Sequence, residues 1–330
     1  MKVWKHSRHD AWMLLFTLAH GAITVWTAFH WNAASDLARA GSVALLAAMM
    51  TYNIIVVAHL FTHTPWFTSS RLNGLVSMLN SFSIGQSVQV YQLAHVRNHH
   101  RHNNDRKGPD GLTADRSSTY RDGEEGEHAP LWRYALGGAC DSMVDMAKAL
   151  ASAARLCRRA PVEPHLAALA ARDEPRRSRE LDQVRRDRLF HAAALLACTI
   201  VSPSWLTMCY LPALCVAFAL VNVQNYYEHF GADPRSRYTD SVSYYGRLYN
   251  LLTFNDGYHQ EHHLRPQAHW RDMPGIRIRH AELLSSLPRV VSPVPALLGF
   301  LHRSRPLLHR AAPPLELGRP RPATSPLDRA

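Results

Sequence analysis

Nine of the 21 histidines in this chain fall into four short clusters. They are His59-Leu-Phe-Thr-His63, His95-Val-Arg-Asn-His99-His100, Asn225-Tyr-Tyr-Glu-His229 and His259-Gln-Glu-His262-His263. Residues three and four apart share one face of a helix, so each cluster can direct its imidazoles at one point. Imidazole is a ligand for zinc, copper, iron and nickel, so the residue type indicates a metal site without naming the metal. The clusters predict a metalloenzyme.

The clusters hold nine histidines, more than one structural metal site uses. A structural zinc ion is satisfied by four ligands, which usually include cysteine. A pair of redox metals with open positions for O2 fits this ligand count better. Metal-bound imidazoles generally donate their second N–H to a nearby acceptor. The candidate acceptors are Glu228, Glu261, Asp105 and Asp256.

Cysteine usage and charge exclude two other classes of site. The five cysteines form no CxxC pair, which argues against both a disulfide framework and a thiolate metal site. The formal net charge is +11, but no helix-turn-helix, RNP-like or zinc-finger pattern organises it, so we expect no nucleic-acid partner. Basic loops at the cytoplasmic side of a membrane explain the charge better.

Apolar blocks between the polar segments predict membrane crossings, each of which takes ~20 residues. The four candidate blocks are residues 11–29, 37–58, 189–201 and 205–223. The third is short for a span and ends at Ser202-Pro203-Ser204. In sequence order the blocks pair as two helical hairpins.

The basic residues predict how these hairpins are oriented. Lys2, Lys5 and Arg8 precede the first block, and the segment between the hairpins is rich in arginine. By the positive-inside rule, both hairpins then have their ends in the cytoplasm. All four histidine clusters follow on the cytoplasmic face, so we expect a multi-pass protein, of a bacterial inner membrane, whose active site faces the cytoplasm.

The remaining segments predict the surroundings of the site. Residues 74–94 and 131–154 mix polar and apolar side chains at helical spacing, which indicates helices at the interface or packed beneath the metal site. Residues 103–130 are charged and contain glycine, which predicts a loop. Residues 292–330 are rich in proline and arginine and predict a partly disordered tail after a domain of residues 1–291.

The order of the clusters resembles the membrane-bound fatty acid desaturase and alkane hydroxylase superfamily. Residues 225–231, NYYEHFG, are similar to the alkane hydroxylase motif around its isolated histidine. Residues 255–266, NDGYHQEHHLRP, are similar to the last histidine box of acyl-lipid and sphingolipid desaturases. The resemblance covers residues 53–274.

The resemblance implies an all-α integral membrane protein with two transmembrane helical hairpins and a cytoplasmic helical cap. The cap would carry a histidine-rich di-iron site, with two iron ions as cofactors and O2 as co-substrate. Asn225 would contact iron through water, as the asparagine four residues before the isolated histidine does in desaturases. The direct iron ligands implied are His59, His63, His95, His99, His100, His229, His259, His262 and His263.

Two departures from the family pattern bear on the site. The first histidine box commonly has an acidic residue after its first histidine, but Leu60 stands there, so that acceptor is missing or comes from elsewhere. The chain has no His-Pro-Gly-Gly segment of a fused cytochrome, no flavin fingerprint and no iron–sulfur cysteine set. The resemblance thus implies a separate electron donor: a ferredoxin, a rubredoxin, or a b-type cytochrome with its reductase.

The predicted activity is O2-dependent desaturation of a fatty-acyl chain, on a lipid or an acyl carrier. Hydroxylation of an alkyl chain and oxidative decarboxylation of a fatty acid use the same centre, and the ligand motifs do not separate these outcomes. An alternative of another class is a non-redox metal-binding membrane protein. That class predicts polar ligands within the spans, whereas the histidines here cluster outside them.

Overall fold

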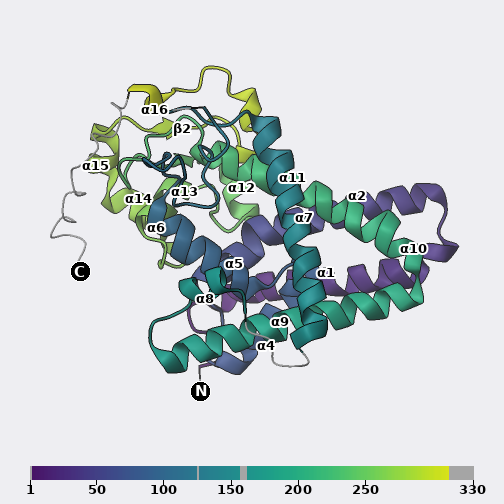
Figure 1. The fold of residues 1–330 in the computed structure, drawn as a ribbon. Coiled ribbons are helices and arrows are strands. Elements are labelled where there is room, and N and C mark those ends of the chain that lie inside the picture. Colours follow the sequence, from purple (N-terminus) through teal and green to yellow (C-terminus); the bar gives the residue numbers. More distant parts are fainter. Residues whose placement is uncertain (1, 125, 157–161, 312–330) are drawn as a thin grey trace.

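The computed structural model describes residues 2–124, 126–156 and 162–311, and these are mostly helical (Figure 1). A base of long helices carries a cap of short helices and loops. The base is formed by α1 (Ala11–His30), α2 (Asp36–Tyr52), α4 (Ser70–Ile84), α7 (Leu131–Leu156), α9 (Glu174–Val201), α10 (Pro203–Trp205) and α11 (Leu211–His229). The cap sits at the end of the base where α2 and α11 have their C-terminal ends.

Three helices in the described part of the chain are long and apolar enough to cross a membrane. They are Arg8–Ala33, Asp36–His63 and Pro203–His229, where short 3-10 and π turns extend the α-helical segments. The predicted third block, residues 189–201, is the second half of α9, whose first half is charged; α9 as a whole does not qualify. The helical fold and these three crossings agree with the sequence prediction, whereas the arrangement as two hairpins is not confirmed.

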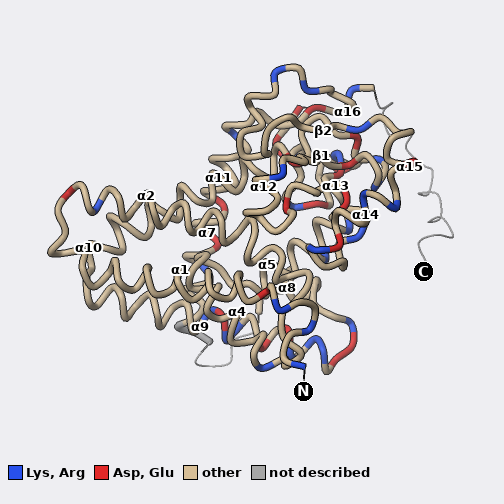
Figure 2. Tube along the Cα trace, turned by 180° about the vertical axis from the view of Figure 1, so that it is seen from behind, with Lys and Arg blue, Asp and Glu red and all other residues tan. Residues whose placement is uncertain are grey.

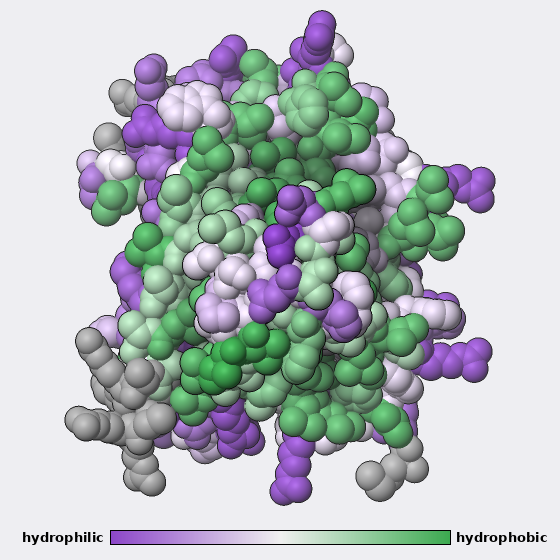
Figure 3. All heavy atoms as spheres, turned by 90° about the vertical axis from the view of Figure 1, so that its right-hand side faces the viewer, coloured by the Kyte–Doolittle hydropathy of each residue, from purple (hydrophilic) through white to green (hydrophobic). Residues whose placement is uncertain are grey.

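The surface of the base suits an apolar surrounding. Trp12, Trp26, Phe29 and Ile200 are exposed, while Trp205 and other large apolar side chains form the core between the helices. Figure 3 looks at the far end of the base, where a small hydrophilic group is bordered by hydrophobic side chains. That end includes an ion pair between Asp36 and Arg39.

Residues 74–94 are divided between α4, which belongs to the base, and α5 (Val88–Ala94), which packs against α4 and α9. Gly85 has a φ of 71° and separates α4 from α5. A Cβ at this position would lie 2.5 Å from a methyl group of Leu214, so glycine serves both the backbone and the packing. The polar residues of α4 face protein: the amide oxygen of Asn80 accepts hydrogen bonds from Thr17 (3.0 Å) and Asn53 (3.1 Å).

The cap is built mainly from loops and short helices. The predicted loop at residues 103–130 has no helix or strand among its described residues. A two-residue parallel pairing joins β1 (Val242–Ser243) to β2 (Val290–Val291). The short helices of the cap are α3 (His59–His63), α6 (His100–His102), α12 (Arg247–Leu252), α13 (His259–Leu264), α14 (Met273–Arg279), α15 (Ala281–Ser286) and α16 (Leu308–Ala311). A further short helix, α8 (Pro164–Leu169), packs against α5 and α9 instead.

Part of the predicted tail is folded. The 3-10 segment Ala296–Leu301 packs against α11. Arg305 is buried and donates a hydrogen bond of 3.0 Å to the carbonyl oxygen of Tyr227. The proline- and arginine-rich residues 312–330 lie outside the described residues.

The N-terminal segment is tied to the last part of the cap. Asp10 is fully buried, and its Oδ1 lies 3.0 Å from Nε2 of His269 and accepts a hydrogen bond of 2.9 Å from Nε1 of Trp270. The amide of Lys5 donates to the carbonyl oxygen of Trp66 at 2.7 Å. The start of α1, the end of α3 and the segment after α13 are therefore held together.

Candidate metal centre

Five histidines from three of the sequence clusters converge on one point. Their ligand nitrogens all lie within 4.8 Å of one another, and four of the five residues are buried. The Nε2 atom of His262 lies 3.1 Å from that of His59 and 3.0 Å from that of His100. We call this set the first histidine group: His59, His63, His95, His100 and His262.

A second convergence lies beside it. His99, His229 and His263 also place ligand nitrogens within 4.8 Å of one another, and all three are buried. The Nε2 atoms of His99 and His263 are 3.3 Å apart. The His259 ring centroid lies 4.6 Å from that of His263 and 5.3 Å from that of His229. The second histidine group is therefore His99, His229, His259 and His263.

Both groups fit a metal ion. Two nitrogen ligands about 2.1 Å from one ion lie about 3.0 to 3.4 Å apart when their bonds meet at octahedral or tetrahedral angles. The measured separations of 3.0 to 3.3 Å fall in this range. Both ring nitrogens of His63 and of His259, and Nε2 of His229, are buried without a hydrogen-bond partner among the described residues. A bound cation would satisfy one nitrogen of each of these rings.

A π-helical turn decides how the second sequence cluster is divided. Helical spacing of four predicts that His95 and His99 share a face, but His95–His99 is a π-helix in which the amide of His100 bonds to the carbonyl oxygen of His95. The wider turn brings residues five apart together. Nε2 of His95 is consequently 3.1 Å from Nε2 of His100, and His99 joins the other group. A second π turn, Asn53–Ala58, directly precedes His59.

Carboxylates stand behind the second histidine group. Oδ2 of Asp115 lies 2.7 Å from Nδ1 of His99, and Oδ2 of Asp240 lies 3.6 Å from Nδ1 of His263. Oε1 of Glu228 lies 3.7 Å from Nδ1 of His259. Such partners fix ring orientation and raise the basicity of a ligand.

The first histidine box has acceptors for His59 although Leu60 stands in place of the usual acidic residue. The side chain of Leu60 is buried in the apolar core, while Oδ1 of Asp256 lies 3.5 Å from Nδ1 of His59. The carbonyl oxygen of Ile55 is also 3.0 Å from that nitrogen. A carboxylate about 200 residues away in sequence, at Asp256, thus stands near the first histidine.

Two of the four predicted acceptors lie next to histidines, and the other two do not. Glu228 and Asp256 face histidines as described. Glu261 instead accepts hydrogen bonds from Ser243 (3.0 Å) and Tyr245 (2.7 Å). Asp105 accepts from the backbone amides of Ala114 and Asp115, so it shapes the loop that carries Asp115. The expectation of histidine contacts was wrong for these two, because their side chains meet closer loop donors.

Asp115 and Asp240 were missed by the sequence analysis. Each lies in an irregular segment. Asp115 contacts His99, 16 positions away, through its side chain, and Asp240 contacts His229, 11 positions away, through its carbonyl oxygen. Helical periodicity carries no signal for such a pair. The cluster of small polar residues around each aspartate indicates only a turn.

The protonation state of His100 and of His262 suits metal binding. Burial, reinforced by the neighbouring histidines, holds the pKa of His100 and of His262 well below the ordinary value, so both are neutral. Burial also acts to lower the pKa of His99, but Asp115 outweighs it and raises that pKa. Burial raises the pKa of Asp240 to about 7, and a cation bound nearby would favour its charged form.

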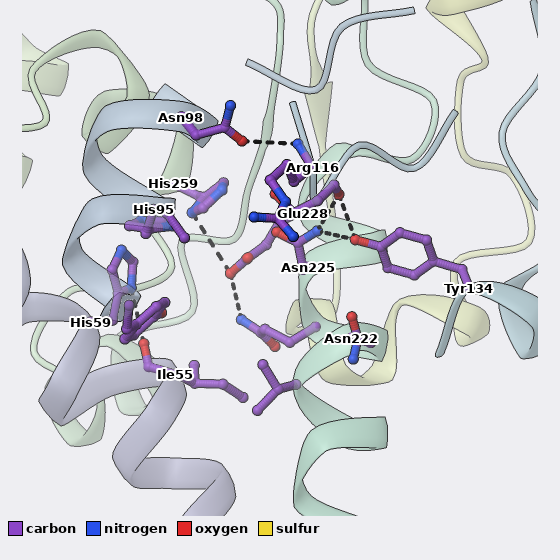
Figure 4. A pocket seen from close by; sticks show the side chains of 15 residues that line it. Ile55, His59, His95, Asn98, Arg116, Tyr134, Asn222, Asn225, Glu228 and His259 are labelled. Carbon is purple, nitrogen blue, oxygen red and sulfur yellow. Dashed lines mark hydrogen bonds and ion pairs between the residues drawn. The ribbon is translucent and has the colours of Figure 1, made fainter. Parts of the chain in front are cut away.

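A cavity of about 210 Å³ borders the histidines (Figure 4). Its walls come from the π turn before His59, from α5 and the following π turn, from α7 and from α11. His59, His95 and His259 line one side, and Tyr134 and Asn222 line another. Most of its exposed wall is apolar, so a hydrocarbon segment can lie beside the metal centre.

Asn225 lies on the wall of this cavity. Its Nδ2 donates to Oη of Tyr134 at 2.5 Å and to the carbonyl oxygen of Ser117 at 3.3 Å. It shares the cavity with three of the nine histidines but belongs to neither histidine group. Its expected water-mediated contact with a metal therefore remains a prediction.

The site agrees with what comparison with known proteins shows. The "Sphingolipid delta(4)-desaturase" of Komagataella phaffii is 34% identical over 90 residues, which cover 25% of each chain. The "Sphingolipid delta(4)-desaturase" of Candida albicans is 47% identical over 53 residues, covering 16% of this chain and 14% of that protein. Human "Sphingolipid delta(4)-desaturase DES1" is 44% identical over 62 residues, 19% of each chain. The matches thus span a quarter or less of these relatives.

No solved structure matches this chain. The sequence model described as "Fatty acid desaturase" matches residues 37–292, which include every histidine of both groups. The match begins with α2 and ends just after β2, so it takes in most of the base and most of the cap. The chain belongs to the fatty acid desaturase family.

Proposed function

We propose that this protein is an O2-dependent di-iron desaturase that introduces a double bond into the hydrocarbon chain of a lipid. The observation that carries the proposal is the adjacency of two buried histidine groups and one largely apolar cavity. Two iron ions, one held by each histidine group, would supply the activation of O2 and the removal of hydrogen from an unactivated C–H bond. The names of the relatives favour a fatty-acyl or sphingoid chain as substrate.

The protein's own residues position the chain and keep water out. Ile55, Tyr91 and Val221 supply apolar surface next to the histidines. Eight of the nine histidines in the two groups are buried, which limits access of water to the reacting atoms. We propose that Asn225, which lines the cavity wall, holds a water molecule there, as the water-mediated ligand role expected for it requires.

The proposed topology places the cap in the cytoplasm. Figure 2 shows Lys and Arg gathered on the cap and around the N-terminus, with few at the far end of the base. This distribution is what the positive-inside rule describes for the cytoplasmic side. Labelling of the variant Ser35→Cys in spheroplasts with a membrane-impermeant thiol reagent tests this orientation. We expect the reagent, added outside, to label this cysteine.

The electron donor is proposed to be a separate, acidic protein. A surface cavity of about 670 Å³ lies beside α13, lined by Leu264 directly after His263 and by the arginines Arg237, Arg265 and Arg279. Complementary charge accelerates protein encounters at low salt. Reduction of the iron-loaded protein by a ferredoxin, a rubredoxin or a b-type cytochrome should therefore slow as salt rises.

Hydroxylation is the second candidate, favoured by the segment NYYEHFG that ends α11. Lipid mass spectrometry on cells with the wild-type protein or with His262→Ala separates the outcomes. A product two mass units lighter supports desaturation, and one heavier by an oxygen atom supports hydroxylation. Loss of CO2 supports oxidative decarboxylation. Zinc without iron in the purified protein, and no new lipid, would instead support a non-redox metal-binding protein.

A further inference from the structure

The cavity beside the metal centre meets a second one at a shared polar wall. The outer cavity, of about 340 Å³, lies along α7. Both cavities are lined by Arg116, Ser117, Tyr134 and Asn222. A molecule that reaches the histidines from the outer cavity passes these four side chains.

Arg116 is the available cation at this junction. Its side chain is exposed and has no hydrogen bond or ion pair among the described residues. The other basic residues of the outer cavity are engaged: Arg121 pairs with Asp141 at 2.9 Å, and Lys148 pairs with Asp145 at 3.5 Å. The guanidinium of Arg116 can therefore donate to an oxygen of a ligand.

Amide oxygens on α11 complement this donor. Oε1 of Gln224 is buried and has no hydrogen-bond partner among the described residues, while its Nε2 donates to Glu228 at 2.7 Å. Asn222 donates its Nδ2 to the carbonyl oxygen of Phe218 at 2.8 Å, which leaves its Oδ1 as an acceptor. A buried amide oxygen without a donor is unfavourable, so the cavity is suited to a ligand that carries N–H or O–H groups.

Gly138 makes room for Asn222. A Cβ at this position of α7 would lie 2.6 to 2.9 Å from the amide atoms of Asn222. Alanine there would force the Asn222 side chain to move. The close approach of α7 to α11 thus keeps a polar side chain at the junction of the two cavities.

We propose that Arg116, Asn222 and Gln224 bind the polar head of the lipid substrate, a head with an acceptor oxygen and hydroxyl or amide hydrogens next to the chain. This inference rests on the proposed function. The inner cavity is smaller than the 300–1,000 Å³ of typical ligand pockets. Because the head-binding residues and three metal-site histidines line that one small cavity, the oxidised carbon lies close to the head.

Binding of a defined lipid tests the head site apart from turnover. The probe is a radiolabelled N-acyl sphinganine, bound to the full-length protein in detergent and measured by scintillation proximity. Arg116→Gln should raise Kd about ten-fold or more, since a hydrogen bond to a charged group is lost. Arg116→Lys should recover part of the affinity, and Gly138→Ala should weaken binding less. Arg133→Gln, which removes an exposed charge on α7 outside both cavities, is the matched control.

The outcomes separate this inference from the proposed function. Unchanged probe affinity in Arg116→Gln, with a melting temperature like that of the control, would overturn the head site even if the enzyme oxidises lipids. A product oxidised far from its head group, located by fragmentation mass spectrometry, would overturn it as well. If probe binding depends on Arg116 but the protein carries no iron and yields no oxidised lipid, the head site stands and the desaturase proposal fails.

Discussion

The first and second histidine groups differ in what stands behind their imidazoles. In the second group, Asp115 contacts His99 at 2.7 Å, and the acidic side chains of Asp240 and Glu228 lie within 3.7 Å of other ring nitrogens. In the first group, one carboxylate, Asp256, approaches one histidine at 3.5 Å. A divalent ion in a buried site is stabilised by nearby negative charge.

The difference indicates that the two groups hold their ions differently. The first has more nitrogen ligands and little compensating charge, whereas the second has fewer ligands and several carboxylates. We infer that the second histidine group binds its ion more tightly and that the ion there is the more electron-rich. Four experiments test this asymmetry, in order of decreasing effect.

Removal of one ligand from each group should have the largest effect. His262→Ala and His263→Ala should each reduce the iron content from two ions to one, and each should lower turnover by more than about 100-fold, beyond what loss of a supporting residue causes. Iron is measured by elemental mass spectrometry on purified protein. His102→Ala is the control, since His102 lies two residues after the second sequence cluster but belongs to neither histidine group. Retention of both ions in His263→Ala would remove that residue from the ligand set.

Asp115→Asn should weaken iron binding in the second group by about 10- to 100-fold, because an amide supports the His99 ring less strongly than a carboxylate. The measurement is ferrous-ion titration of the metal-free variant. The two sites respond separately, so the affinity of the first group should change little. An equal loss at both sites would contradict the assignment of Asp115 to one group.

Ferrous-ion titration of the metal-free wild-type protein should show two steps about ten-fold apart in affinity, a difference of about 1.4 kcal/mol. The tighter step should be absent in His263→Ala and the weaker step absent in His262→Ala. The opposite assignment would break the proposed link between carboxylates and affinity.

Asp256→Asn should have the smallest effect, a loss of less than about ten-fold at the first group. His59 keeps the carbonyl oxygen of Ile55 at 3.0 Å, which still fixes the ring when the carboxylate at 3.5 Å is replaced. A larger loss here than in Asp115→Asn would reverse the comparison.

The sequence was sufficient to find the nine histidines that converge in the two groups, because their short spacings set them apart from the other histidines of the chain. It also predicted the helical class and the loop at residues 103–130. It did not predict the division into two groups, since the π turn at His95–His99 changes which residues share a face. Nor did it find Asp115 or Asp240, because loop conformation brings them to the histidines.

The membrane base was predicted less completely. Hydropathy located three apolar helices, but α9 combines a charged first half with an apolar second half in one continuous helix. The segment before Gly85 is too polar to face lipid, and its packing explains this polarity. The amide oxygen of Asn80 accepts hydrogen bonds from Thr17 and Asn53 inside the base. Such pairings between distant segments have no local pattern in the sequence.

The bond between Asp10 and the pair His269 and Trp270 has a consequence for biogenesis. It joins residues about 260 positions apart and lies directly beyond the last histidine box. Neither histidine group is complete before α13 has been synthesised, by which time the first two apolar helices have left the ribosome. Iron binding as proposed would therefore require that α13 has already met the N-terminal helices, and the contact of Asp10 with His269 and Trp270 helps to hold these segments together.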